Sequence, residues 1–172
     1  MMKRIRVMKT PVALLVVLTF ISCAVPSVRA DVSDWSLMDT QGETFRLSAI
    51  GGSSPVLLLF WATWCAPCKK ELNDHKELFD SFTEKGVTVL LVSEDTQRTQ
   101  SKVKPYVESK GYSWQCLLDT NGEVLKRYGG TSLPYTVLLD NAGNPVQKIR
   151  GAVRDAKTLS AQIDELLGAH GE

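Results

Sequence analysis

The chain has 172 residues, of which 44% are hydrophobic and 23% charged. This composition is typical of a globular protein with one ordinary domain and a short additional segment. The formal net charge is +1, but residues 1–30 hold five basic residues and no acidic one. The remainder is therefore mildly acidic, which argues against nucleic-acid binding, because that function needs a basic face. Four cysteines are also too few for a disulfide-rich scaffold of this length.

Residues 1–30 have the pattern of a secretory signal peptide. Basic residues at 3–9 precede an apolar run of about ten residues, from Val12 to Ile21. That run is too short to span a bilayer, which needs about 20 residues. Val28 and Ala30 then occupy the two positions that a signal peptidase reads. We therefore expect cleavage after Ala30 and a mature domain over residues 31–172.

Two alternatives for this segment remain open. The stretch Phe20–Cys23 resembles a bacterial lipoprotein box, in which Cys23 would be lipidated, although Phe20 stands where Leu is usual. An uncleaved membrane anchor is the other alternative. All three interpretations predict a periplasmic or otherwise extracytoplasmic domain, in a compartment where thiols tend to be oxidised.

The predicted elements of the domain alternate between strands and helices. A β-hairpin is expected first, because two short apolar segments flank the polar turn at residues 39–42. The continuous apolar run at 56–62 predicts a central, fully buried strand. Further strands are expected at 87–92, 114–118, 135–139 and 146–149, and helices at 65–85, 99–110, 123–128 and 155–167. This order predicts an α/β fold with a central mixed sheet covered on both faces.

Two cysteines directly follow the central strand, in the sequence Trp61-Ala-Thr-Trp-Cys-Ala-Pro-Cys68. A spacing of three residues places both thiols on one face of the first helical turn. The positive end of the helix favours a thiolate over a thiol. We therefore predict Cys65, at the exposed start, as the nucleophile and Cys68, one turn further in, as the resolving thiol. Pro67 stiffens a turn in which its missing N–H costs nothing.

The rest of the sequence disfavours other uses of this CxxC pattern. A structural zinc site needs four ligands, and only Cys116, His75 and His170 remain after residue 30. Covalent haem attachment needs a histidine after the second cysteine, where this chain has Lys69. We therefore expect redox chemistry with no metal and no small-molecule cofactor. Cys116 and His75 lie in apolar patterns, so burial in the core is the simpler interpretation of both.

On these residues, the chain from about Trp35 to Leu167 resembles the thioredoxin superfamily. More narrowly, it is similar to the TlpA-like, cytochrome-c-maturation-type periplasmic thioredoxins. The resemblance rests on the CxxC segment and on two later stretches, Leu117 to Gly129 and Ser132 to Asp140. It implies a thioredoxin fold with an N-terminal hairpin and a βα insert. It also implies a cis peptide between Leu133 and Pro134 that faces the cysteines and shapes a groove for the partner's backbone. The other residues expected to line this groove are Trp64, Ala66 and Pro67.

The chain departs from thioredoxin at the buried acid that moves the proton of the resolving cysteine. By alignment that position is Leu59, and the lysine that pairs with the acid falls at about Leu91. Proton transfer at Cys68 must then use water or another acid. Glu94 is the candidate, because it follows the 87–92 strand on the side where such strands deliver ligand-facing residues. The alternative for Glu94 is a solvated carboxylate.

The sequence therefore predicts an enzyme that carries out thiol–disulfide exchange on exported proteins. The resemblance favours a reductant of apocytochrome c or other exported disulfides, with a membrane redox relay as electron donor. The residues do not show the direction, so a disulfide-donating oxidase of the same fold stays open. A copper-binding chaperone also stays open, although that function usually needs CxxxC. A peroxidase-type relative would need a Pro-xxx-Thr pattern, which the segment from Trp61 to Cys68 lacks.

Overall fold

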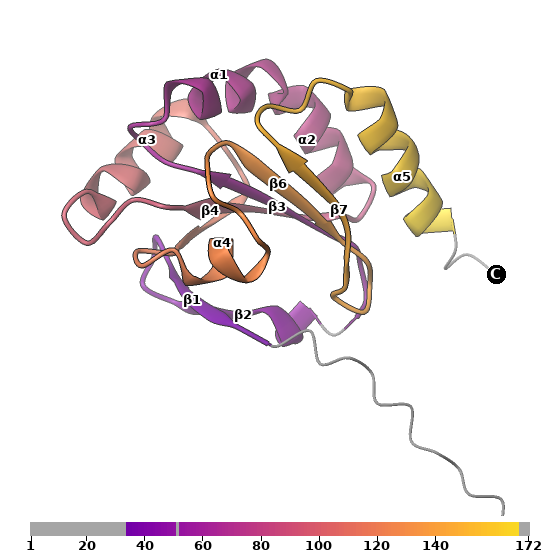
Figure 1. The fold of residues 1–172 in the computed structure, drawn as a ribbon, viewed down its shortest axis with the longest axis horizontal. Coiled ribbons are helices and arrows are strands. Elements are labelled where there is room, and N and C mark those ends of the chain that lie inside the picture. Colours follow the sequence, from indigo (N-terminus) through magenta and orange to yellow (C-terminus); the bar gives the residue numbers. More distant parts are fainter. Residues whose placement is uncertain (1–33, 51, 169–172) are drawn as a thin grey trace, which may run out of the picture. The chain divides into compact units, whose positions relative to one another are not determined.

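The structure is a computed structural model that describes residues 34–50 and 52–168. The predicted signal peptide, its cleavage site and Cys23 lie outside the described residues. In the described part of the chain, seven strands form one mixed sheet in the order β2-β1-β5-β4-β3-β6-β7. Helices cover both faces of the sheet (Figure 1), as the sequence predicts.

The strands and helices follow the predicted order closely. The strands are β1 (Ser36–Asp39), β2 (Thr44–Arg46), β3 (Val56–Trp61), β4 (Thr88–Ser93), β5 (Gln115–Leu118), β6 (Tyr135–Leu139) and β7 (Pro145–Arg150). The α-helices are α1 (Ala66–Asp74), α2 (Lys76–Glu84), α3 (Val103–Lys110), α4 (Glu123–Arg127) and α5 (Ala156–Gly168). Short 3-10 helices occupy Leu47–Ile50 and Gln100–Lys102.

Strand β3 lies at the centre of the sheet and all six of its residues are buried. It pairs parallel with β4 and antiparallel with β6. A strand with neighbours on both edges and helices on both faces has no solvent-facing side, which is why its sequence shows no polar alternation. The end of β3 is therefore a rigid base for the residues that follow it.

The predicted hairpin forms and extends the sheet. Strands β1 and β2 pair antiparallel, with Leu37 opposite Phe45. The Asp39 carboxylate closes the turn by accepting hydrogen bonds from the backbone N–H groups of Gln41 (2.8 Å) and Glu43 (2.9 Å). Strand β1 then pairs antiparallel with β5, which together with α4 forms the predicted βα insert between α3 and β6.

The single helix predicted over 65–85 is in fact two helices, α1 and α2, that meet at His75. Three weak helix formers in succession, Asn73, Asp74 and His75, account for the break. His75 is half-buried and packs edge-on against Phe79, with ring centroids 6.0 Å apart. The expectation that His75 is buried in the core is therefore wrong.

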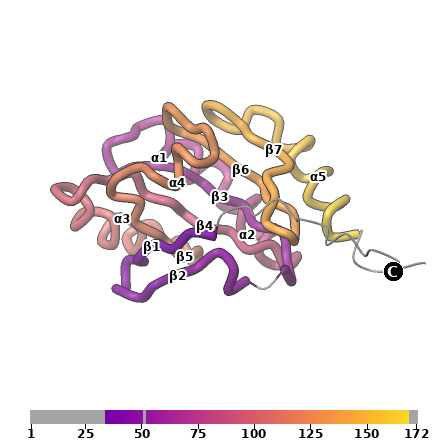
Figure 2. Tube along the Cα trace, turned by 60° about the horizontal axis from the view of Figure 1, so that its bottom comes forward, coloured from indigo at the N-terminus to yellow at the C-terminus, as the bar shows by residue number. Residues whose placement is uncertain are grey.

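The two faces of the sheet carry separate hydrophobic cores. Helices α1, α2, α3 and α5 cover one face, and α4 covers the other (Figures 1 and 2). Alternate residues of β3 point to opposite cores, so Leu59 and Trp61 belong to the first core and Leu58 and Phe60 to the second. Both Cys65 and Cys68 pack in the first core. A residue near the cysteines must therefore come from this side of the sheet.

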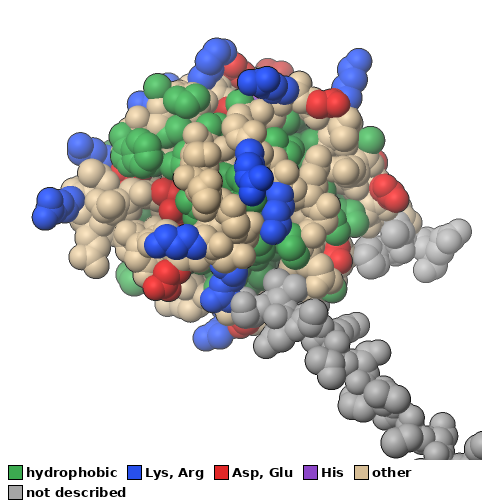
Figure 3. Space-filling view, viewed as in Figure 1, with side chains coloured by type: hydrophobic (Ala, Val, Ile, Leu, Met, Phe, Trp, Pro, Cys, Tyr) green, Lys and Arg blue, Asp and Glu red, His purple; other side chains and the backbone are tan. Residues whose placement is uncertain are grey.

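A minority of the acidic side chains lie in the interior. Among the described residues, four carboxylates are buried, those of Asp39, Glu71, Asp95 and Asp119. On the face shown in Figure 3, lysine and arginine side chains are more prominent than acidic ones.

Candidate active site

The cysteines are held by the junction of β3 and α1. Cys65 is the N-cap residue of α1, with an extended backbone (φ −84°, ψ 96°). Its N–H donates to the Ala62 carbonyl oxygen at 3.0 Å, which closes a tight turn after β3. Cys65 and Cys68 form a disulfide with a Cα–Cα distance of 5.3 Å, within the usual range for such bonds. The predicted pairing is therefore possible without any movement of the helix.

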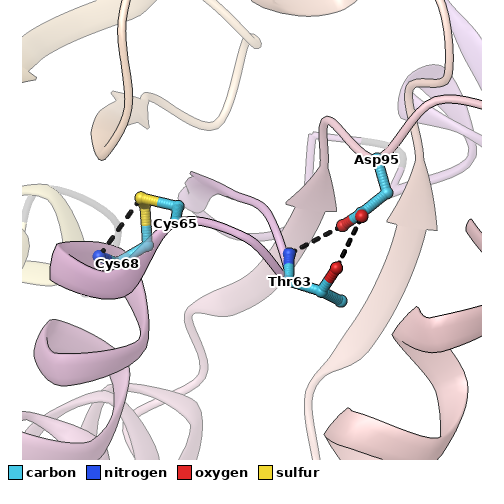
Figure 4. The surroundings of a disulfide bond; sticks show 4 residues. All are labelled: Thr63, Cys65, Cys68 and Asp95. Atoms are coloured by element: carbon cyan, nitrogen blue, oxygen red, sulfur yellow. Dashed lines mark hydrogen bonds between the residues drawn. A yellow bond between two sulfur atoms is a disulfide. The ribbon is translucent and has the colours of Figure 1, made fainter. Parts of the chain in front are cut away.

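The helix start provides a hydrogen bond to the sulfur of Cys65. The backbone N–H of Cys68 donates to Cys65 Sγ at 3.3 Å (Figure 4). In the reduced protein this N–H and the positive end of the helix would stabilise a thiolate at Cys65. Cys68 is completely buried, whereas Cys65 is 5% exposed. Cys65 is thus the more exposed of the two cysteines, by a small margin, as the assignment of Cys65 as the attacking thiol requires.

A partner can reach the surface around the disulfide. Trp64 is 64% exposed, and Ala66 and Pro67 are exposed as well. Trp61, by contrast, is 1% exposed and packs against Tyr106 with ring centroids 5.3 Å apart. The two tryptophans around the CxxC segment thus have different environments: Trp61 is a core residue, and the indole of Trp64 is exposed to solvent.

The peptide bond between Leu133 and Pro134 is cis, as the resemblance implies. Tyr135 pairs with Phe60 in the antiparallel β3–β6 ladder, so Pro134 continues the register to the level of Trp61. Leu133 is partly buried and packs against the core that contains both cysteines. The segment with the cis-proline therefore lies on the sheet end that carries the disulfide.

Glu94, the residue predicted to relay a proton to Cys68, has Asp119 as its carboxyl partner in the structure. Leu90 and Val92 of β4 face the α4 core, and Glu94 continues their alternation, away from the core of Cys68. Its carboxyl group interacts with Asp119. Burial, and then the negative charge of Asp119, raise the pKa of Glu94 to about 9.

Sequence reasoning missed a buried acid on the helix of the cysteines themselves. Glu71 follows Cys68 by three residues on α1 and is buried. Its carboxylate accepts a hydrogen bond from the backbone N–H of Val153 at 2.7 Å. Burial raises the pKa of Glu71. The i, i+3 spacing places its side chain on the same side of α1 as Cys68, and this spacing is the signal that could have identified it.

The third cysteine of the described residues is not part of the site. Cys116 is buried in β5, and burial raises the pKa of its thiol to about 12. A thiol with so high a pKa is a poor nucleophile and a poor metal ligand. The expectation that Cys116 behaves as a small buried hydrophobe is consistent with this position. Across residues 34–50 and 52–168, no three His, Cys, Asp or Glu side chains gather in a way that could bind a metal ion.

Together, the strand, the CxxC at the start of the next helix and the cis-proline at the same sheet end define a thioredoxin-fold protein of the thiol–disulfide exchange class. The chain belongs to the AhpC/TSA family, whose sequence profile matches residues 28–148. Within the described part of the chain, no helix is both long and apolar enough to cross a membrane.

Known proteins similar to this chain are named for thiol–disulfide exchange. Thiol-disulfide oxidoreductase ResA from Bacillus thuringiensis subsp. konkukian is 33% identical over 121 residues, which cover 70% of this chain and 68% of the relative. ResA from Bacillus subtilis is 32% identical over 127 residues, with coverage of 74% and 69%. A crystal structure from Chlorobium tepidum, assigned as thiol:disulfide interchange protein DsbE, has a TM-score of 0.69 and 25% identity, covering 80% of this chain and 95% of that one. The chain is thus a thioredoxin-like thiol–disulfide oxidoreductase.

Proposed function

We propose that this oxidoreductase reduces disulfides in exported proteins, with Cys65 as nucleophile and Cys68 as resolving thiol. The observation that supports this most directly is the N-cap position of Cys65, whose sulfur accepts the N–H of Cys68 at 3.3 Å. A thiolate is the reactive form in thiol–disulfide exchange. An N-cap sulfur with an N–H donor is suited to carry that charge.

In the first step, the Cys65 thiolate attacks one sulfur of the partner's disulfide. A bond forms between Cys65 Sγ and that sulfur, the partner's S–S bond breaks, and the partner's other sulfur leaves as a thiolate. Trp64, Ala66, Pro67, Leu133 and Pro134 form the surface on which we place the partner's backbone. Exposure of the first three residues supports this assignment, and so does the location of the cis peptide at the same sheet end.

In the second step, Cys68 loses its proton and attacks Cys65 Sγ. The intramolecular disulfide forms, the mixed disulfide breaks, and the partner's second sulfur leaves as a thiolate. The partner thus gains two electrons and the protein loses two. Because Glu94 faces Asp119, we place the proton of Cys68 on Glu71, the buried carboxylate one turn further along α1.

The setting of the reaction follows from the sequence pattern of residues 1–30. As an export signal, a lipoprotein signal or an anchor, this segment would place the domain in the periplasm or another extracytoplasmic compartment. The electrons would then come from a membrane redox relay. The partners would be apocytochrome c or other exported proteins, as the TlpA-like resemblance suggests.

The reduction potential of the Cys65–Cys68 pair tests the direction. The purified protein is equilibrated in thiol buffers of defined potential, and the redox state is read from tryptophan fluorescence, because Trp61 and Trp64 flank the site. We expect a value nearer that of thioredoxin, about −270 mV. A value of about −120 mV, at the strongly oxidising end of the range for such dithiol pairs, would instead indicate a protein that donates disulfides.

A further inference from the structure

A network of hydrogen bonds around one buried carboxylate lies beside the disulfide, in the segment that leads into Cys65. The carboxylate of Asp95, which is completely buried, accepts two hydrogen bonds from Thr63. The backbone N–H of Thr63 donates to Oδ2 at 2.7 Å, and the Thr63 hydroxyl donates to Oδ1 at 2.6 Å (Figure 4). The hydroxyl of Ser93 donates to Oδ2 at 3.0 Å. Both oxygens of Asp95 are therefore used to hold neighbouring groups.

These hydrogen bonds connect two segments that are 32 residues apart in the sequence. Thr63 lies two residues before Cys65, and Asp95 lies two residues after β4. The backbone N–H of Glu94 adds a third connection, to the Trp61 carbonyl oxygen at 2.8 Å. The residue between Thr63 and Cys65 is the exposed Trp64, which can contribute little packing to the segment. The path of the chain into the N-cap therefore depends strongly on Asp95.

The chemistry of the pair explains why a carboxylate stands at this position. Hydrogen bonds to an ionised acceptor are shorter and about twice as strong as those between neutral groups, and both bonds from Thr63 are short. A carboxylate can accept from Thr63 twice and from Ser93 as well. An asparagine amide would turn an NH₂ group toward one of these donors. None of the ion pairs between described residues involves Asp95, so its contacts are those of a hydrogen-bond acceptor.

We propose that Asp95 is a positioning residue for thiol–disulfide exchange, which acts through Thr63 to hold Cys65 in its N-cap geometry. This inference rests on the proposed function of Cys65 as the nucleophile. Held in this geometry, the Cys65 sulfur accepts the N–H of Cys68, and the thiolate is stabilised. When the pair is broken, the segment before Cys65 gains freedom, and the sulfur spends less time against that N–H.

Three variants separate positioning from the mere presence of a negative charge. Thr63→Val removes the hydroxyl but keeps the shape of the side chain and the charge of Asp95. Asp95→Asn removes the charge as well as the preferred acceptor. Thr63→Ser keeps the hydroxyl and is the conservative variant. The first readout is the pKa of the Cys65 thiol in the reduced protein, from the pH dependence of its alkylation by iodoacetamide. The second is kcat/KM for the reduction of insulin with dithiothreitol as electron source.

If Asp95 positions Cys65, Thr63→Val and Asp95→Asn both raise the pKa of the Cys65 thiol and lower kcat/KM by about 10- to 100-fold, the range expected for a misplaced reacting group. Thr63→Ser then stays close to the wild type in both readouts. The double variant Thr63→Val/Asp95→Asn has the same kcat/KM as Asp95→Asn alone, because both substitutions break the same pair. A fall in the pKa of Cys65 in Asp95→Asn, with no change in Thr63→Val, would mean that Asp95 acts through its charge and would overturn the proposal. Unchanged values in both variants would overturn it too.

A matched pair elsewhere in the chain controls for stability. Thr158 donates its N–H (3.0 Å) and its hydroxyl (2.6 Å) to the Asp155 carboxylate at the start of α5. Thr158→Val therefore removes the same kind of hydrogen bond without touching the segment before Cys65. It is expected to lower the unfolding temperature but to leave the pKa of Cys65 unchanged. If Asp95→Asn fails to fold, Thr63→Val and Thr63→Ser decide the question alone.

Cys65→Ser tests the proposed function separately from the role of Asp95. Insulin reduction that survives this substitution would refute the assignment of Cys65 as the nucleophile.

Discussion

Glu94 and Asp119 form a carboxyl pair where β4 and β5 end. The Asp119 carboxylate accepts hydrogen bonds from the N–H groups of Glu123 (3.0 Å), Val124 (2.9 Å) and Leu125 (3.0 Å). It therefore satisfies free N–H groups in the first turn of α4, at the helix end where a negative charge is favoured. Burial and this neighbouring charge raise the pKa of Glu94 to about 9, so Glu94 holds its proton at neutral pH. Two carboxyl groups side by side are thus compatible because only one of them is ionised.

This pair predicts that the domain loses stability as the pH rises from about 5 to 9. In this window the folded state keeps the proton of Glu94 and the unfolded state has released it, so the free energy of unfolding falls with pH. Glu94→Gln mimics the protonated form and removes this loss. We expect the variant to gain on the wild type by about 1–2 kcal/mol between pH 5 and pH 9, after allowance for solvent screening. Urea unfolding at several pH values measures the difference.

Glu123→Gln is the control for this prediction, since Glu123 is an exposed carboxyl group at the start of α4, the helix that Asp119 contacts. It should shift stability by a similar small amount at every pH in the range. A difference between wild type and Glu94→Gln that does not change with pH would show that Glu94 is ionised in the folded protein.

Glu71 gives a prediction about rate. In Glu71→Gln the amide oxygen can still accept the N–H of Val153, so the free energy of unfolding should change by less than about 1 kcal/mol. The amide cannot take up a proton from Cys68, however, and the resolving step should slow by about 10²-fold. Stopped-flow measurement of the decay of a mixed disulfide isolates this step. The exposed Glu77 of α2 provides a control in Glu77→Gln, and equal decay rates for both variants would exclude Glu71 as the proton acceptor.

Substitution of the two cysteines should have different effects on the mixed disulfide with a partner. Cys68→Ser leaves Cys65 able to attack a partner but removes the thiol that releases it, so a covalent mixed disulfide should accumulate. Cys65→Ser should accumulate none, because Cys68 is completely buried. Non-reducing electrophoresis followed by mass spectrometry of the trapped species measures both outcomes. Equal trapping by the two variants would contradict the assignment of roles.

The two tryptophans beside the CxxC segment should give opposite results when truncated. Trp64 is 64% exposed, so Trp64→Ala should change the free energy of unfolding by no more than about 0.5 kcal/mol while weakening protein disulfide reduction. Trp61 is 1% exposed, and Trp61→Ala should cost about 3–5 kcal/mol, as for other buried aromatic residues. Urea unfolding and insulin reduction test the pair. Undiminished insulin reduction by Trp64→Ala would remove Trp64 from the partner surface.

Local patterns were enough to predict most of the fold. The apolar run of β3 and the three-residue spacing of the cysteines are short-range features, and the cis peptide came with a recognisable family motif. The break at His75 was not predicted, because the apolar spacing continues through it and outweighs three weak helix formers.

The buried acids were harder to assign, because their partners are distant in the sequence. Glu94 lies directly after β4, as predicted, but its carboxyl group interacts with Asp119, which is 25 residues later in the sequence. Glu71 is held by Val153, 82 residues later, and Asp95 by Thr63, 32 residues earlier. No pattern within one segment shows such contacts.

The interior position of Cys116 limits how the domain can be oxidised. A domain with three thiols could in principle close three different disulfides, or link to a second copy through the thiol left over. Cys116 lies in β5, away from the Cys65–Cys68 disulfide, and burial raises the pKa of its thiol to about 12, so it holds its proton at neutral pH and does not compete in exchange. Each cycle of oxidation and reduction therefore returns the folded domain to the same covalent structure.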